Sequence, residues 1–396
     1  MKINNIWQKI NYNLIIIEIM VFDTVIIGAG AMGSATAYWL SKYQNVALIE
    51  QFDLLHHNGS SHGESRVIRK TYRENHFSDM MNEAYTLWND VQNETKKQVY
   101  WKIGGLDLGI EGNIDLTKTI KVCEDRELNH QILNARELRA KYPAYSKIND
   151  DYSAIYQEDT GILNASKSVD MFQRQAMSQG CQVIPNSPVL SIKDSGELKI
   201  IETLGNTYYA KKVIVTTGSW MNKLVNSLGY ELGLKIWKLS FGYYKVKDFN
   251  HFMPKNFPVF IHWGNDYDYG FPIHEKNGYV KIAPHDNKLI EKLDFNDGNN
   301  NVNQELIDHV SNFIDNTFTG IDTSNPLIET CLYTMTENEN FIIDYFPDDD
   351  NIILAGGFSG HGFKFTPLIG KILQEMTIEG ESRFHLNEFK LNNFIK

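Results

Sequence analysis

The stretch Val25-Ile26-Ile27-Gly28-Ala29-Gly30-Ala31-Met32-Gly33 determines how the first region of the chain folds. Its β-branched run ends in the pattern GxGxxG, and helix-forming residues follow from Met32 to Ser41. In such a strand–turn–helix unit Gly28 permits the tight turn, Gly30 lets a pyrophosphate approach the backbone, and Gly33 lets the helix pack close to the strand. The helix N-terminus adds N–H donors and a positive dipole for the phosphates. The pattern therefore predicts a dinucleotide site.

An acidic residue further along the chain supports this prediction. The apolar run Val46-Ala47-Leu48-Ile49 predicts a second buried strand, and Glu50 follows it, roughly 20 positions after Gly28. A carboxylate at that spacing binds a ribose diol and disfavours a 2′-phosphate, which argues against NADP. We predict that Val25–Glu50 binds the ADP half of a dinucleotide, against the alternative of a Gly-rich turn without a ligand. This unit alone does not distinguish NAD from FAD.

The length, composition, net charge and cysteine content of the sequence limit the class of protein. A chain of 396 residues is too long for one compact core and predicts two domains. Its 42% of hydrophobic residues indicates a globular protein, and its net charge of -11 argues against a nucleic-acid partner, because phosphate binding needs a basic face. The cysteines Cys123, Cys181 and Cys331 lie far apart without a CxxC pair. This pattern excludes a disulfide scaffold or a cysteine zinc site and fits a reducing cytoplasm.

The N-terminal residues contain a short apolar run, Leu14 to Ile17, which Glu18 interrupts. The run is too short to span a bilayer, and neither a cationic start nor a small-residue cleavage site indicates a signal peptide. We interpret residues 1–19 as an extension before a strand that starts after Met20. Since no other segment approaches membrane-spanning length, we predict a soluble, cytoplasmic protein without a membrane partner.

The remaining patterns alternate between helix and strand. Apolar spacing predicts helices at Ser78–Val91, where it indicates packing against a core, at Asp170–Gly180 and from Pro367 onward. Strands are expected at Phe22–Ile27, Gln182–Ile184, Val213–Gly218 and Ile352–Ala355, with a hairpin at Glu197–Ala210. The segment Ile236–Asp286 is strand-rich and aromatic, which is typical of an antiparallel sheet with one face on a ligand cavity. An exposed loop is expected at Asn296–Asn303.

These elements predict an α/β protein whose second domain is α+β. A discontinuous Rossmann-like domain is expected over residues 20–90, 150–235 and 322–396, after the extension 1–19. An antiparallel-sheet domain that binds the substrate is expected over residues 91–149 and 236–321.

Four further stretches, read with the GxGxxG pattern, carry a resemblance to a known family. They are Ser61-His62-Gly63-Glu64-Ser65-Arg66-Val67-Ile68-Arg69, Lys281-Ile282-Ala283-Pro284-His285, Cys331-Leu332-Tyr333-Thr334-Met335 and Gly357-Phe358-Ser359-Gly360-His361-Gly362-Phe363-Lys364-Phe365. With these motifs in this order, the chain resembles the monomeric sarcosine oxidase and N-methyltryptophan oxidase family from Phe22 to the C-terminus.

The resemblance implies an FAD-dependent oxidase of a small N-methyl amino acid. In this family the amine donates hydride to flavin N5, the imine hydrolyses to the amino acid and formaldehyde, and dioxygen takes the electrons and becomes hydrogen peroxide. The family cysteine that matches Cys331 carries the flavin as an 8α-S-cysteinyl thioether. The alternative for Cys331 is an inert buried cysteine, the reading that Cys123 and Cys181 keep.

The resemblance also assigns charged residues. Arg69 and Lys364 match the pair that binds the substrate carboxylate, although Arg66, Arg69 and Lys70 could instead form a basic strip on a solvated surface. Lys281 matches a lysine that water holds over flavin N5, where a cation favours electron transfer to dioxygen. Arg66 lies by resemblance on the flavin side of the cavity.

Several uncharged residues complete the expected site. The family residues that match Tyr269, His285 and Tyr333 line the substrate pocket, although a histidine in an aromatic sheet is more often a hydrogen-bonded core residue. Residues expected to bind the cofactor are Gly28, Gly30, Gly33, Glu50, His62, Ser65, Arg66, Cys331, Gly357, Gly360 and Lys364. No metal is predicted, because no carboxylate cluster at ligand spacing accompanies the histidines near position 60.

Three alternative functions stay open. The first is a related flavin amine dehydrogenase or a glycine- or pipecolate-type oxidase. The second is a flavin-bound redox module without turnover, and the third is an NAD-dependent dehydrogenase, which the motifs around Cys331 and Lys364 disfavour. The family resemblance implies a monomer.

Overall fold

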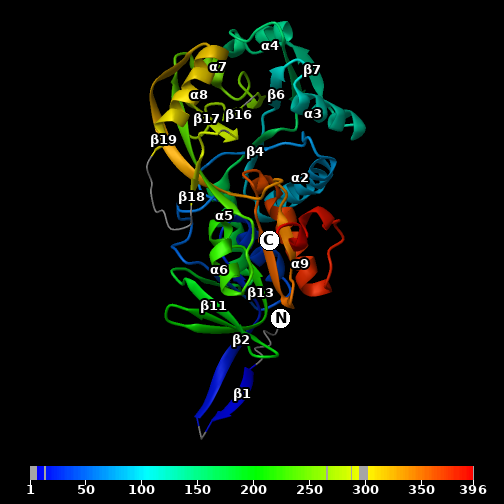
Figure 1. Cartoon of the computed structure of the whole chain (residues 1–396), viewed down its shortest axis with the longest axis vertical. Helices are drawn as coiled ribbons and strands as arrows, with labels where there is room; N and C mark the ends of the chain where they lie inside the picture. Colours follow the sequence, from blue (N-terminus) through cyan, green and yellow to red (C-terminus); the bar gives the residue numbers. More distant parts are fainter. Residues whose placement is uncertain (1–6, 13–14, 265, 287, 294–301, 396) are drawn as a thin grey trace. The chain divides into compact units, whose positions relative to one another are not determined.

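The computed structural model describes residues 7–12, 15–264, 266–286, 288–293 and 302–395 (Figure 1). The chain forms two compact units. The first unit contains Met1–His62, Ser166–Lys235 and Thr334–Lys396, and the second contains Gly63–Ala165 and Ile236–Tyr333. Three segments expected with the Rossmann-like domain, residues 63–90, 150–165 and 322–333, therefore lie in the second unit.

A parallel sheet forms the centre of the first unit. Its parallel strands lie in the order β10 (Gln182–Ile184), β3 (Val46–Ile49), β2 (Ile15–Ile27), β13 (Thr207–Val215) and β21 (Asp349–Gly356). Antiparallel neighbours are β11 (Val189–Asp194), β12 (Lys199–Thr203) and β20 (Ile342–Phe346). Every strand expected in this region is present, and the expected hairpin and the strand after it share one continuous strand, β13.

The start of β2 corrects one expectation. This strand begins at Ile15, not after Met20, and pairs in antiparallel register with β1 (Trp7–Tyr12), from Trp7 opposite Met20 to Tyr12 opposite Ile15. In Figure 1 the two strands form the blue hairpin. The β-branched residues at 15–17 favour extended backbone, which lengthens the strand toward the N-terminus.

Helices pack against the parallel sheet. They are α1 (Ala31–Leu40), α5 (Ala165–Ser178), α6 (Met221–Ser227) and α9 (Thr366–Glu379), with 3₁₀ turns η2 (Gly218–Trp220), η3 (Gly362–Phe365), η4 (Asn387–Phe389) and η5 (Leu391–Asn393). Proline occupies the first turn of α9, as expected. The indole Nε1 of Trp39 in α1 donates to the Pro367 carbonyl at 3.0 Å, which ties α1 to the start of α9.

The second unit is built on a mostly antiparallel sheet. Its strands lie in the order β18 (Glu291–Leu293), β14 (Lys235–Val246), β17 (Tyr279–Asp286), β16 (Tyr267–Phe271), β15 (Val259–Trp263), β6 (Gly105–Ile110), β8 (Tyr152–Gln157) and β7 (Gln131–Asn134), and β19 (Ile321–Met335) pairs with β14. A three-stranded sheet contains β4 (Arg66–Ile68), β9 (Gly161–Leu163) and β5 (Tyr100–Lys102). The predicted α/β fold with an α+β second part is confirmed.

Helices of the second unit are α2 (Asn75–Thr95), α3 (Ile114–Asp125), α4 (Ala135–Lys141), α7 (Phe249–Phe252) and α8 (Gln304–Thr317), with the 3₁₀ turn η1 (Pro143–Tyr145). The apolar stripe of α2 is buried, including Met81, Trp88 and Val91, so its predicted packing role is confirmed. The expected loop at Asn296–Asn303 lies mostly outside the described residues. No helix in the described part of the chain is both long and apolar enough to cross a bilayer.

Candidate active site

The predicted strand–turn–helix–strand unit forms from β2, α1 and β3. Gly28 has a φ of 100°, and a Cβ there would lie 2.6 Å from the Thr216 carbonyl oxygen. A Cβ on Gly33 would lie 1.9 Å from the Gly28 carbonyl oxygen. Both positions require glycine because turn, helix and strand meet there in direct backbone contact.

The N-terminus of α1 suits an anion. Its N-cap, Gly30, has no side chain to bond the backbone N–H groups, and the first turn contains no acidic residue. Nearby, the hydroxyl of Thr217 is buried without a hydrogen-bond partner among the described residues. The Thr217 Cα, just after β13, lies 3.2 Å from the place of a Cβ on Gly28, so Thr217 lies beside the turn. A diphosphate bound here would accept hydrogen bonds from N–H groups at the start of α1 and from the Thr217 hydroxyl.

Glu50 is held at the carboxyl end of β3. Its Oε2 accepts from the Ala29 N–H at 2.8 Å and its Oε1 from the Phe52 N–H at 3.1 Å, while His56 Nε2 lies 3.4 Å away. Burial alone would raise the pKa of Glu50, but His56 and the two N–H groups outweigh it and the pKa is lowered. Glu50 is therefore an ionised acceptor beside the GxGxxG turn, as a ribose diol requires.

Replacing Gly33 with Ala should destabilise the protein by about 3 kcal/mol and weaken ADP binding, because the added methyl group displaces either the turn or α1. Denaturant unfolding followed by fluorescence and titration with ADP measure the two effects. Gly59→Ala is the matched control, since a Cβ there would lie 3.5 Å from its nearest neighbour, His56. Equal stability of the two variants would contradict this account of the turn.

In the second unit, the ammonium of Lys281 lies in an aromatic surrounding. Its Nζ is 4.4 Å from the ring centre of Phe241, 5.6 Å from that of Phe271 and 5.7 Å from that of Tyr243. Lys281 is only 6% exposed. Burial, joined by the nearby Arg66 cation, lowers its pKa, while Glu275 acts in the opposite direction. A buried ionisable group whose pKa is shifted in this way is a candidate for a functional site.

Glu275 is the residue of this site that the sequence patterns missed. Its Oε1 lies 3.2 Å from Lys281 Nζ and accepts from Ser65 Oγ, and its Oε2 accepts from Tyr243 OH at 2.5 Å. Burial opposes its ionisation, but Lys281 and these hydroxyls lower the pKa of Glu275 to about 2. The available signal was one of two acids, with Asp268, in the aromatic stretch between Tyr267 and Lys281. Ser65, expected at the cofactor, contacts this pair.

Cys331 lies in the same cluster, packed against Phe241, Tyr243 and Ala283. Burial raises the pKa of its thiol, and the cations of Arg66 and Lys281 act against that increase. The Arg66 guanidinium also donates to the Ser65 carbonyl at 2.7 Å. The thiol thus lies near two cations, which favour its thiolate form.

The predicted pocket residues Tyr269, His285 and Tyr333 lie together. The hydroxyls of Tyr269 and Tyr333 are 3.2 Å apart, and the His285 ring centre lies 5.7 Å from that of Tyr333 and 6.5 Å from that of Tyr269. Burial is the main cause that raises the pKa of Tyr269 to about 12, and the pKa of Tyr333 rises well above its ordinary value. Both phenols are therefore neutral hydrogen-bonding groups at neutral pH.

Arg69 has a partner that the sequence did not indicate. Its guanidinium lies 3.6 Å from Asp107 and 3.3 Å from Thr71 Oγ1, and it is stacked 4.6 Å from the ring centre of Tyr72. Asp107 also accepts from Trp263 Nε1 at 3.1 Å. Arg69 is 9% exposed, so the alternative of a solvated basic strip is wrong for this side chain. The signal in the sequence for this partner of Arg69 was Asp107, an acid inside the otherwise apolar strand β6.

The C-terminal motif forms a turn before α9 in the first unit. Lys364 is 5% exposed and donates to the His361 carbonyl at 2.6 Å. Between Gly357 and Gly360, Ser359 Oγ donates to the Gly357 carbonyl at 3.0 Å and accepts from Thr336 N–H at 3.1 Å. These contacts fix the turn that ends β21 and begins α9.

Two of the histidines near position 60 lie against one another. In the first unit His62 is buried and stacks on His57, with ring centres 5.0 Å apart. Among the residues described, no group of three His, Cys, Asp or Glu side chains is placed to hold a metal ion.

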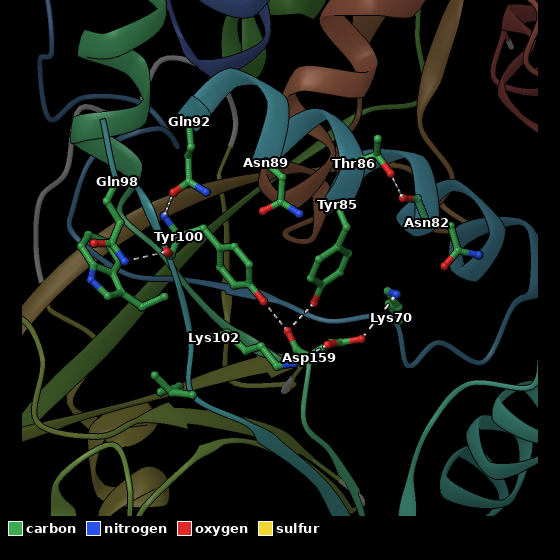
Figure 2. A pocket seen from close by; sticks show the side chains of 12 residues that line it. Lys70, Asn82, Tyr85, Thr86, Asn89, Gln92, Gln98, Tyr100, Lys102 and Asp159 are labelled. Carbon is green, nitrogen blue, oxygen red and sulfur yellow. Dashed lines mark hydrogen bonds and ion pairs between the residues drawn. The ribbon is translucent and has the colours of Figure 1, made fainter. Parts of the chain in front are cut away.

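A separate polar pocket lies beside α2 in the second unit (Figure 2). The hydroxyls of Tyr85 and Tyr100 donate to the Asp159 carbonyl at 2.9 and 2.6 Å, and Lys102 pairs with the Asp159 carboxylate at 2.9 Å. Gln92 Oε1 accepts from two backbone N–H groups. These groups satisfy one another, and no predicted site residue lines the pocket, so the Lys281 cluster is the stronger candidate.

Comparison with known proteins shows the family to which the chain is similar. Residues 23–376 match the family described as FAD dependent oxidoreductase (DAO). A probable sarcosine oxidase of Arabidopsis thaliana is 33% identical over 391 residues, covering 94% of this chain and 92% of that protein. An N-methyl-L-tryptophan oxidase of Shigella dysenteriae is 30% identical, covering 95% of this chain and 100% of that protein. The structure of NikD, an unusual amino acid oxidase essential for nikkomycin biosynthesis, shares the fold with a TM-score of 0.84 at 19% identity, covering 94% of this chain and 97% of that one.

Proposed function

This chain belongs to the DAO family of FAD dependent oxidoreductases, and from that premise we propose that it oxidatively demethylates an N-methyl amino acid of the sarcosine or N-methyltryptophan type. It is an FAD-dependent oxidoreductase that acts on a CH–NH group with oxygen as acceptor. The products would be the amino acid, formaldehyde and hydrogen peroxide. The family resemblance seen in the sequence is confirmed.

The residues present fit FAD. Gly28, Gly33 and the first turn of α1, which contains no acidic residue, suit its diphosphate, and ionised Glu50 suits its ribose. When bound, FAD supplies the acceptor for the substrate hydride and the donor of electrons to dioxygen. We propose Cys331 as the residue that would hold it covalently, on the grounds that Arg66 and Lys281 favour the thiolate.

The single observation that carries the proposal is the buried cation of Lys281 beside Cys331. A positive charge in a low-dielectric, aromatic surrounding stabilises negative charge that develops on oxygen more strongly than a solvated lysine does. Tyr269 and Tyr333, with neutral hydroxyls 3.2 Å apart, would orient a substrate by hydrogen bonds, and His285 would border the same face. We propose these residues as the catalytic side of the site.

Arg69 is the proposed partner of the substrate carboxylate in the second unit. Its planar guanidinium has five donors, and Asp107 at 3.6 Å leaves that ion pair beyond direct hydrogen-bonding distance. Asp107 and Thr71 would hold the guanidinium in place while a second carboxylate binds it. We propose Lys364, in the first unit, as a further positive charge for an anionic ligand.

A peroxide assay over a small amine panel tests the function. We expect hydrogen peroxide with sarcosine or N-methyl-L-tryptophan, and a rate at least about 100-fold lower with dimethylamine, which lacks the carboxylate for Arg69. Glycine and pipecolate serve as comparison substrates. Peroxide formed only with those two would replace the proposed substrate class. Substrate oxidation without peroxide would indicate a dehydrogenase, and no oxidation of any amine would indicate a flavin-bound module without turnover.

Three further expectations accompany the proposal. A monomer is consistent with the bacterial relatives, which are named monomeric sarcosine oxidases. A reducing cytoplasm fits three cysteines that form no disulfide in the structure. Dioxygen and a small amine are the proposed partners, with no nucleic acid among them.

A further inference from the structure

The Lys281 ammonium and the Glu275 carboxylate form a buried ion pair, with side chains 6% and 7% exposed and 3.2 Å between Nζ and Oε1. The aromatic rings of Phe241 and Phe271 border the ammonium and do not solvate its charge as water would. Burying an unpaired ammonium is costly, and such a lysine releases its proton instead. The charge on Lys281 therefore depends on an anion within contact distance.

Glu275 is held rigidly enough to act as that anion. Ser65 Oγ donates to Oε1, Tyr243 OH donates to Oε2 at 2.5 Å, and Ser65 Oγ lies 3.3 Å from Lys281 Nζ. Two fixed donors on one carboxylate leave it a single orientation. The fixed carboxylate therefore sets the direction of the Lys281 ammonium group as well as pairing with its charge.

The other charges around Lys281 act in different directions. Arg66 is a second cation that opposes its protonation, and Cys331 favours protonation only in its thiolate form. Glu329, the next acid in this region, pairs with Lys276 at 3.1 Å and reaches Tyr243 OH at 3.4 Å without contacting Lys281. Glu275 is thus the one carboxylate among the described residues that forms an ion pair with Lys281.

We propose that Glu275 is the positioning residue that keeps Lys281 protonated and fixes the direction of its ammonium group. The inference deepens the proposed function and rests on it, because it concerns the lysine that would assist electron transfer to dioxygen. The Glu275 carboxylate contacts the Lys281 ammonium, and Glu275 acts on the reaction only through this lysine.

The test compares wild type, Glu275→Gln and Glu275→Asp as flavin-loaded, full-length proteins. Trace labelling with acetic anhydride across about pH 6 to pH 10, with mass spectrometry of the Lys281 peptide, measures where the lysine loses its proton. Because Gln keeps an acceptor for Ser65 or Tyr243 but removes the charge, the titration of Lys281 should move down by about two pH units. In Asp the charge persists, so this titration should stay near that of wild type.

Stopped-flow reoxidation with dioxygen measures the consequence. At neutral pH, Glu275→Gln should react about tenfold or more slowly, and the rate should recover as the pH falls, because a lysine cation with a lowered pKa is lost as pH rises and regained as pH falls. Glu275→Asp retracts the carboxylate and should slow the reaction without this new pH dependence. Anaerobic reduction by substrate should change less than reoxidation in both variants.

Glu329→Gln is the matched control, since it removes a nearby negative charge without touching Lys281. The proposal is overturned if Lys281 titrates alike in wild type and Glu275→Gln, or if Glu275→Gln and Glu329→Gln reoxidise alike. Should Glu275→Gln fail to fold, an unchanged reoxidation rate in a folded Glu275→Asp would overturn the directional role. Failure of the proposed function appears separately, as a Lys281→Met variant with normal reoxidation, while the labelling experiment still tests the ion pair.

Discussion

Replacing Lys281 with Met should slow electron transfer to dioxygen by about 100- to 1,000-fold and leave oxidation of the amine nearly unchanged. The expected selectivity follows from the surroundings of Lys281, where the ammonium lies 4.4 Å from the Phe241 ring centre and is only 6% exposed. A charge at such a site acts on a neighbouring oxygen with little screening. Met retains much of the chain length and packs against aromatic rings, so the variant removes mainly the charge. Stopped-flow kinetics measures the two half-reactions separately.

Lys276→Met provides the control for that experiment. Lys276 also faces the Tyr243 ring, at 4.4 Å, but its side chain is 36% exposed and pairs with Glu329 at 3.1 Å. Its loss should affect neither half-reaction by more than about twofold, because water screens its charge. Equal slowing of amine oxidation and reoxidation in Lys281→Met would show that Lys281 acts in substrate binding or folding instead.

Local sequence patterns predicted the central sheet well. The run Val46–Ile49 forms a strand with the expected bounds, because an apolar run inside a parallel sheet is buried on both faces and depends little on its neighbours. Gln182–Ile184 also forms a strand with the expected bounds, at the partly exposed edge of the sheet. The early start of β2 was missed, since pairing with β1 is a contact between segments and leaves no periodic signal. Likewise, residues 63–90 lie in the second unit because β4 pairs with β9, roughly 100 positions further along the chain.

In the site too, local motifs could be predicted from the sequence, whereas contacts between distant segments could not. Lys281, Cys331 and Tyr333 were located through motifs, and the structure places them in the second unit around one aromatic face. Two acids were not predicted, Glu275, which pairs with Lys281, and Asp107, which pairs with Arg69, because an acid in a strand-rich segment is normally a solvated charge. Only the fold shows that each carboxylate is buried against a cation, and a buried cation needs that partner to stay charged.

Replacing Cys331 with Ala should release the yellow cofactor completely on acid precipitation, whereas the wild-type pellet should keep its colour. We propose this on chemical grounds, since thioether formation requires a thiolate and Cys331 is the half-buried thiol near the cations of Arg66 and Lys281. Burial raises the pKa of all three thiols, that of Cys123 to about 12 and that of Cys181 to about 11, but only at Cys331 do two cations oppose the increase. Those two thiols should stay unreactive at neutral pH.

Cys123→Ala and Cys181→Ala are therefore the matched controls, and both should retain colour in the pellet. Absorbance of pellet and supernatant after precipitation measures the fraction attached. Colour released from wild type would show that FAD is held without a covalent bond, and colour retained by Cys331→Ala would place the bond on another residue. Because Ala removes only the sulfur from a residue packed against Phe241, Tyr243 and Ala283, the second outcome could not be attributed to a collapsed site. Attachment at Cys331 would also fix the flavin ring system near Lys281, since the Cys331 sulfur and the Lys281 ammonium interact electrostatically.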